Sequence, residues 1–218
     1  MCAIVGSSNA DILKEFIKLN SYRGSHSYSI SLFNKTTGIL SVLEKRLGKP
    51  SLDNLTIPAN SYAIVHIQAP TTDGKTREFI HPATLVGKFE SWPEQALWHN
   101  GIIKDEVVKE NISKWNTSWD TMQILKCLHD SDNRWTELNE FDGTFSCLYY
   151  DRANLSLYIF RNEISPMFVD DNLNLSSTKF EGSRETEPNK VFKINFSTNS
   201  FTEVGKFTTV ENPYYFME

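Results

Sequence analysis

Residues 1–8 read MCAIVGSS, with a cysteine directly behind the first methionine and a short apolar run that ends in glycine and serine. The β-branched run and the Gly-Ser turn predict a strand at the start of the chain. Residues 10–20, ADILKEFIKLN, carry Ile12 and Phe16 at helical spacing, which predicts an amphipathic helix. Cys2 fits neither apolar pattern, so core packing does not explain it.

Beyond this opening, two blocks of predicted strands flank a predicted helical pair. Strands are predicted over 27–34, 38–46 and 61–69, helices over 104–115 and 120–130, and an antiparallel meander from residue 141 onward. Within residues 95–105, QALWHNGIIKD, the pair Asn100-Gly101 between apolar runs predicts a tight turn that joins two short strands. This order predicts an α+β domain in which two sheets face each other and the helices lie outside.

Composition narrows the class of protein. The chain has 218 residues, a net charge of −5 and a pI near 5.6, which argues against a nucleic-acid partner. No apolar stretch approaches the roughly 20 residues of a membrane helix, and no secretory signal precedes the first strand. The three cysteines, of which Cys127 and Cys147 lie in apolar patterns, form no CxxC pair. This usage indicates a reducing, cytoplasmic location and neither a disulfide framework nor a zinc site.

A series of short motifs follows Cys2 in a fixed order. The series is Arg23-Gly24, His66-Ile67-Gln68 with Thr71, His99-Asn100-Gly101, Asp120-Thr121, Gly143-Thr144-Phe145 and Arg161-Asn162. In this order the chain resembles the class II glutamine amidotransferase domain, a branch of the N-terminal-nucleophile hydrolases. It looks most like the glutaminase halves of glucosamine-6-phosphate synthase and asparagine synthetase. The resemblance implies a four-layer αββα sandwich of two antiparallel sheets, formed as a single domain over residues 2–218 with no synthetase domain attached.

The resemblance also implies a chemistry for Cys2. A thiolate attacks an amide carbonyl and needs a base, which at a true N-terminus is the cysteine's own α-amine, with a pKa near ~8. This requires removal of Met1, since an acylated amine is no base. Asn100, through its side-chain amide, and Gly101, through its backbone N–H, match the pair that stabilises the oxyanion. The plain alternative for Asn100-Gly101 is a hairpin turn.

Further positions match substrate-binding residues of this family. Asp120 matches the aspartate that binds the α-ammonium of glutamine, although it also fits the N-cap of a capping box with Gln123. Thr71 matches a substrate-binding threonine. Arg23 matches a residue beside the nucleophile, and a solvated surface arginine is its alternative.

The histidines near these motifs are expected to be structural rather than metal ligands. The positions of His66, His81 and His99 are structural in relatives, and these residues lack metal-ligand spacing with nearby carboxylates. We therefore expect no metal and no cofactor.

Gln68 departs from the family pattern. Relatives place an arginine there to grip the α-carboxylate of glutamine, and a neutral amide does not reproduce that bidentate pair. Arg77 in the following loop is a candidate replacement. The departure leaves three interpretations open: a weak glutamine hydrolase that supplies ammonia to a separate synthetase subunit, an amidase for another γ-glutamyl-type amide, or a non-catalytic interaction or structural module that retains the fold.

Overall fold

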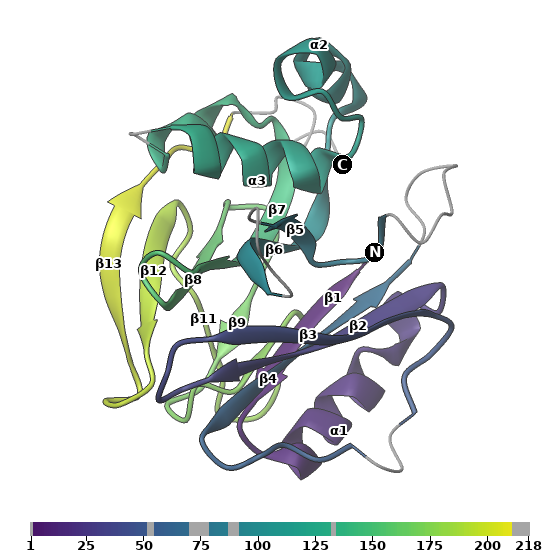
Figure 1. Ribbon diagram of the computed structural model, residues 1–218, viewed down its shortest axis with the longest axis vertical. Helices are drawn as coiled ribbons and strands as arrows, with labels where there is room; N and C mark the ends of the chain where they lie inside the picture. Colours follow the sequence, from purple (N-terminus) through teal and green to yellow (C-terminus); the bar gives the residue numbers. More distant parts are fainter. Residues whose placement is uncertain (1, 52–54, 70–78, 87–91, 132–133, 211–218) are drawn as a thin grey trace.

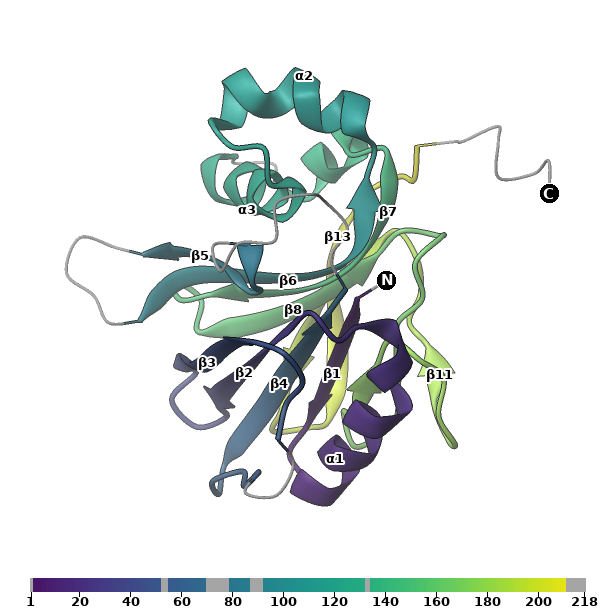
Figure 2. The same ribbon diagram turned by 90° about the vertical axis from the view of Figure 1, so that its right-hand side faces the viewer.

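The protein was analysed as a computed structural model, which describes residues 2–51, 55–69, 79–86, 92–131 and 134–210. Two antiparallel sheets pack face to face, with helices on both outer surfaces (Figures 1 and 2). The fold is therefore the predicted αββα sandwich.

The first sheet holds the N-terminal strand at its centre. Its strands, in spatial order, are β11 (Arg184–Glu185), β9 (Phe168–Val169), β10 (Leu175–Ser176), β1 (Ala3–Ser7), β4 (Ser61–Gln68), β2 (Ser27–Asn34) and β3 (Leu40–Leu47). Strand β1 pairs with β4 along its whole length, with Ala3 opposite Ile67. The start of β1 and the end of β4 therefore lie at the same end of the sheet.

The second sheet is built around two long strands. Its strands, in spatial order, are β13 (Ser200–Lys206), β12 (Lys190–Asn195), β8 (Ser156–Arg161), β7 (Gly143–Asp151), β6 (Pro93–Ile103) and β5 (Ala83–Val86). The predicted meander after residue 141 is only partly correct, because β9, β10 and β11 leave this sheet and join the first. The chain then returns to the second sheet through β12.

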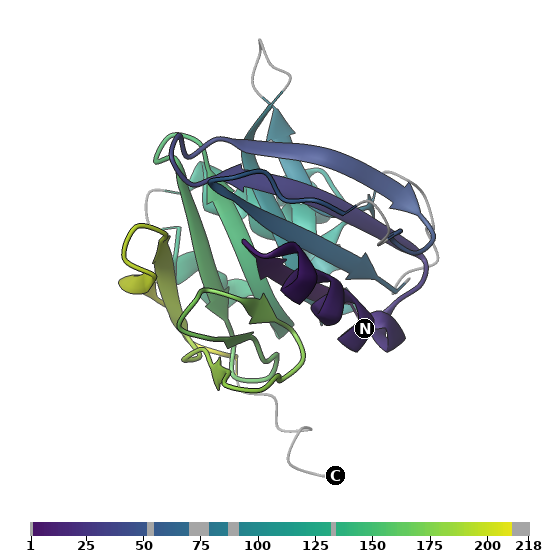
Figure 3. The ribbon, with the colours of Figure 1, turned by 90° about the horizontal axis from the view of Figure 1, so that it is seen from below.

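The helices cover the two outer faces unequally. Within the described residues, the α-helices are α1 (Ala10–Leu19), α2 (Asp105–Trp115) and α3 (Asp120–Asp130), and 3-10 helices span Ser21–Arg23 and Thr136–Glu140. Helix α1 lies against β1 and β4 rather than over β2 and β3 (Figure 3). Helix α3 packs on β6 and β5, and α2 packs on α3.

Three apolar layers hold the sandwich together. The central layer, between the sheets, contains Ile4, Ile64, Trp98 and Tyr150 among others. One outer layer lies between α1 and the first sheet, and the other lies between α3 and the second sheet. Every residue of β4 is buried, as expected for a strand covered on both faces.

One predicted turn is wrong. Asn100 and Gly101 do not form a hairpin but lie inside the single strand β6, which pairs residue by residue with β7 from Gln95 to Ile103. The glycine is required by close approach, because a Cβ on Gly101 would lie 1.8 Å from the carbonyl oxygen of Thr144. Strand pairing therefore prevails over the local turn preference of Asn-Gly.

Candidate active site

A cavity of about 280 Å³ opens at the end of the sandwich where β1 begins and β4 and β6 end. It is lined by Cys2, Gln68, Phe79, His81, His99, Gly101, Ile102, Ile103, Asp105, Val108, Ser118, Trp119, Asp120 and Thr121. Two sheets and the first turns of α2 and α3 thus contribute to one pocket. Its volume suits a small ligand.

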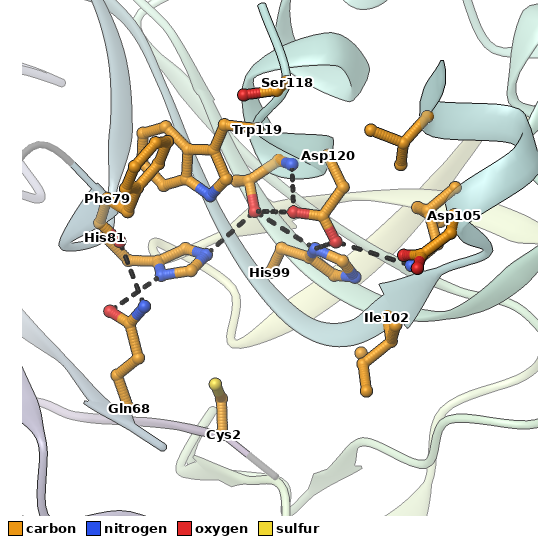
Figure 4. Close-up of a pocket in the computed structure, with 14 residues that line it drawn as sticks. Cys2, Gln68, Phe79, His81, His99, Ile102, Asp105, Ser118, Trp119 and Asp120 are labelled. Carbon is orange, nitrogen blue, oxygen red and sulfur yellow. Dashed lines mark hydrogen bonds and ion pairs between the residues drawn. The ribbon is translucent and has the colours of Figure 1, made fainter. Parts of the chain in front are cut away.

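Cys2 lies directly before the central strand β1, and its sulfur points into this cavity (Figure 4). The residue is only 5% exposed, and its thiol donates to the carbonyl oxygen of Ala69 at 3.7 Å. Burial raises the pKa of the Cys2 thiol. The thiol therefore needs a base to become a nucleophile at neutral pH.

The segment before β2 supports the backbone of Cys2 from outside the cavity. Arg23 donates from Nη1 to the carbonyl oxygen of Cys2 at 3.4 Å and from Nε to Thr178 Oγ1 at 3.1 Å. Gly24 permits a close chain crossing, because a Cβ there would lie 2.4 Å from the carbonyl carbon of Gln68. Arg23 is absent from the cavity lining, so its contacts place it behind the thiol rather than against a ligand.

Gly101 lines the cavity, whereas Asn100 lies just behind it. The Asn100 side chain is buried between the sheets, where its Nδ2 donates to Ser177 Oγ at 3.3 Å. The same hydroxyl accepts from the backbone N–H of Ile4 on β1 at 2.9 Å. This bridge ties β6 to the strand that carries Cys2, so both predicted oxyanion residues lie close to the thiol's strand.

Asp120 begins α3 but does not cap it. The N-cap residue is Trp119, and the carboxylate of Asp120 accepts from the Ile103 N–H at 3.4 Å and lies 3.7 Å from His99 Nδ1. The side chain of Gln123 donates to the carbonyl oxygens of Val108 and Thr117. The predicted capping box is therefore wrong, because the carboxylate turns toward β6 and the cavity.

Gln68 ends β4 on the opposite side of the cavity, and the protein holds both ends of its amide. Nε2 donates to the carbonyl oxygen of Phe79 at 3.0 Å, and Oε1 accepts from Ser27 Oγ at 3.1 Å. His81 Nδ1 lies 3.4 Å from the same Oε1. The side chain is therefore fixed by its neighbours and presents no charge to the cavity.

Three histidines meet at the cavity, and two of them, His81 and His99, line it. No local sequence pattern shows that they are neighbours. The ring of His66 stacks on that of His81 at 4.0 Å, and His66 Nε2 lies 3.0 Å from the carbonyl oxygen of His99. The hydroxyl of Thr121 lies between His81 Nε2, at 3.0 Å, and His99 Nδ1, at 3.2 Å. Burial lowers the pKa of His66 to about 3 and that of His81 well below its usual value. Both rings are therefore neutral at pH 7.

Phe79 and Trp119 form an aromatic wall that the motif series did not indicate. Their rings pack edge to face at 5.5 Å, and Trp119 also contacts His81 at 5.4 Å (Figure 4). Thr71 and Arg77 lie outside the described residues. Single aromatic residues in loops carry no sequence signal for such a wall.

Two features are absent from the part of the chain that the structure describes. None of its groups of three or more His, Cys, Asp or Glu side chains is placed to hold a metal ion. None of its helices is both long and apolar enough to cross a bilayer. Cys2, Cys127 and Cys147 are all free thiols.

Comparison with solved structures identifies the fold as that of the glutamine amidotransferases, so the predicted resemblance is confirmed for the fold. The match to glutamine phosphoribosylpyrophosphate amidotransferase from B. subtilis, complexed with ADP and GMP, has a TM-score of 0.69 at 15% identity. A structure described as the allosteric regulatory enzyme of purine biosynthesis matches with a TM-score of 0.68 at 14% identity.

Both matches cover 94% of this chain but only 49% and 48% of the other chains. The protein thus spans about half the length of these relatives. No family model and no curated protein matches the sequence.

Proposed function

We propose that the protein is a thiol-dependent amidohydrolase of the glutamine amidotransferase kind, with Cys2 as its nucleophile. The observation that carries the proposal is the position of Cys2 at the head of the central strand, facing a cavity that Gly101 also lines. The fold alone does not determine chemistry. The thiol, the backbone of β6 and the carboxylate of Asp120 are proposed as nucleophile, oxyanion donor and substrate anchor, and the base is the α-amine of Cys2 once Met1 is removed.

The proposed reaction has two steps. The α-amine of Cys2, free after removal of Met1, takes the thiol proton, and the sulfur attacks the carboxamide carbon. The C–N bond breaks, ammonia leaves with the transferred proton, and a thioester to Cys2 remains. Water then attacks the thioester, which releases a carboxylate and restores the thiol.

Two groups on β6 are proposed to assist, one on Gly101 at the cavity wall and one on Asn100 just behind it. The backbone N–H of Gly101 and the side-chain amide of Asn100 are the candidate donors to the oxyanion, and each such donor typically contributes ~3–4 kcal/mol to the transition state. The raised pKa of the buried thiol makes the base essential. This explains why an N-terminal cysteine suits the site.

The test is ammonia release by the protein with Met1 removed, compared with its Cys2→Ala variant. We expect the rate of ammonia release to be lower by about 10³-fold or more in Cys2→Ala, with an unchanged circular dichroism spectrum. Cys127→Ala is the matched control, because Cys127 is a second buried thiol in the layer beneath α3. Equal ammonia release by the wild type and Cys2→Ala contradicts the proposal.

A non-catalytic module is the second candidate function. The burial of the Cys2 thiol against Ala69 and the full engagement of the Gln68 amide favour it. It predicts that the protein with a free Cys2 amine hydrolyses no amide.

A separate synthetase subunit as the receiver of ammonia is also a proposal. The test is whether a candidate synthetase uses ammonia from this protein more efficiently than free ammonium.

A further inference from the structure

The described lining of the cavity carries negative charge, whereas an amino-acid substrate also needs a cation to bind its carboxylate. Asp120 and Asp105 bring two carboxylates to its lining. Among the lining residues that the structure describes, none is a lysine or an arginine. A substrate with a carboxylate would meet like charge here, whereas an ammonium group would meet opposite charge.

Three cationic side chains of the described residues around the cavity are held by other partners. Arg23 donates to the Cys2 carbonyl oxygen and to Thr178. Lys104 pairs with Asp142, and Lys45 donates to the carbonyl oxygen of Pro82. Each of these side chains lies outside the cavity lining.

The described lining residues opposite Asp120, namely Gln68 and His81, carry no charge. Gln68 directs both ends of its amide into the protein, to Phe79 and Ser27, and it therefore presents no fork of donors to a carboxylate. His81 beside it is kept neutral by burial. The adjoining wall is aromatic, and aromatic faces attract cations rather than anions.

We propose that the substrates of this site are primary carboxamides that carry an amino group but no carboxylate. The inference rests on the proposed function and names its substrate class. The ammonium group binds Asp120 beneath the wall of Phe79 and Trp119, and the carboxamide lies over Cys2. Water converts the amide to a carboxylate and ammonia, with the bonds broken and formed as above.

Four small amides that share the butanamide skeleton and differ only in the groups on its carbon 4 test this directly. Glutamine has both the amine and the carboxylate, 4-aminobutanamide only the amine, glutaramate only the carboxylate, and butanamide neither. We expect 4-aminobutanamide to have the highest kcat/KM, about tenfold or more above both glutamine and butanamide. A carboxylate that increases kcat/KM, with glutamine as the best of the four, overturns the inference.

Two substitutions test which residues cause the preference for an amine without a carboxylate. Asp120→Asn keeps an acceptor for the Ile103 N–H but removes the charge. In this variant we expect kcat/KM for 4-aminobutanamide to exceed that for butanamide by about threefold or less, with kcat/KM for butanamide unchanged. Glu106→Gln is the matched control, because Glu106 is an exposed carboxylate in the same turn as Asp105 but outside the lining. Gln68→Arg raises kcat/KM for glutamine relative to 4-aminobutanamide by about tenfold. An unchanged ratio of kcat/KM for 4-aminobutanamide to that for butanamide in Asp120→Asn contradicts the inference.

A binding measurement separates this inference from the proposed function. The Cys2→Ala protein is melted with each of the four amides. A larger increase in Tm with 4-aminobutanamide than with glutamine supports the substrate class even if the wild type releases no ammonia, in which case only the proposed function fails. The inference itself fails if glutamine gives the larger increase, or if no amide is hydrolysed and none raises the Tm.

Discussion

The cavity has two sides that are built in different ways. The proposed reactive side consists of Cys2 and Gly101, with Asn100 just behind it, and the proposed recognition side consists of Gln68, Phe79, Trp119 and Asp120. Strand pairing and close backbone approach fix the reactive side. Side-chain hydrogen bonds and ring contacts fix the recognition side. A single substitution can therefore change what is bound, while changing the reactive groups requires moving the central strands.

Gly101→Ala gives the largest expected effect and tests the backbone origin of the reactive side. Its Cβ would lie 1.8 Å from the Thr144 carbonyl oxygen and 2.7 Å from His99 Nε2, so β6 and β7 must separate locally. We expect a loss of ~3 kcal/mol or more in the free energy of unfolding and no measurable ammonia release. Urea denaturation and an ammonia assay measure both quantities.

The control for Gly101→Ala is Gly182→Ala. Gly182 has a φ of +74° with open space around its Cβ position, so only backbone strain of about 1 kcal/mol is added. Equal losses of stability in the two variants would contradict the role of close approach.

Asn100→Ala removes one proposed donor to the oxyanion. We expect kcat to fall by about 10²-fold with little change in KM, because the interaction forms mainly in the transition state. Steady-state kinetics on the preferred amide measure the change. Asn174→Ala is the control, since Asn174 is a buried amide bonded to Ser7 at the far end of β1. A similar fall in kcat in both variants would assign the effect to stability.

The histidines at the recognition side make stability dependent on pH. His66 has a pKa of about 3 in the folded protein against 6.5 ordinarily, so below pH 6.5 the unfolded chain binds more protons. The free energy of unfolding therefore falls as the pH falls from about 6.5 toward 3, by about 1.4 kcal/mol per pH unit for this residue. His66→Gln removes the contribution of His66 and leaves that of His81, so the slope becomes smaller, whereas His129→Gln, at an exposed residue, retains the full slope. Identical slopes in urea titrations of both variants would contradict the assignment.

Arg23→Met gives the smallest expected effect, because Arg23 contacts the Cys2 backbone rather than the cavity. Loss of that hydrogen bond costs about 1 kcal/mol, so we expect about a fivefold lower kcat/KM. Arg46→Met, at an exposed arginine paired with Glu44, is the control. A loss of about 10³-fold in Arg23→Met would instead indicate direct contact with the substrate.

Much of the fold was predictable because its signals are local. The apolar spacing of α1 and the β-branched residues of β4 each identify one element. The Asn100-Gly101 turn was mispredicted because pairing with β7 extends β6 through it. Strands β9 and β10 were assigned to a meander because no local feature shows that they cross to the first sheet.

The site was predictable only where one residue carries the chemistry. Cys2, Gly101, Gln68 and Asp120 all line the cavity, as the resemblance implies. The cluster of His66, His81 and His99 combines two strands and a loop, and the direction of the Asp120 carboxylate depends on the position of Ile103. Such contacts arise only from the tertiary arrangement.

The central claim is that a free Cys2 amine turns this buried thiol into a nucleophile. The most direct test is the intact mass of two forms of the protein, one with Met1 and one without, after exposure to a diazo-ketone analogue of 4-aminobutanamide. We predict a single adduct on Cys2 only in the form without Met1, with Cys127 and Cys147 unmodified. Equal labelling of both forms, labelling at another cysteine, or no adduct in the form without Met1 would contradict the claim.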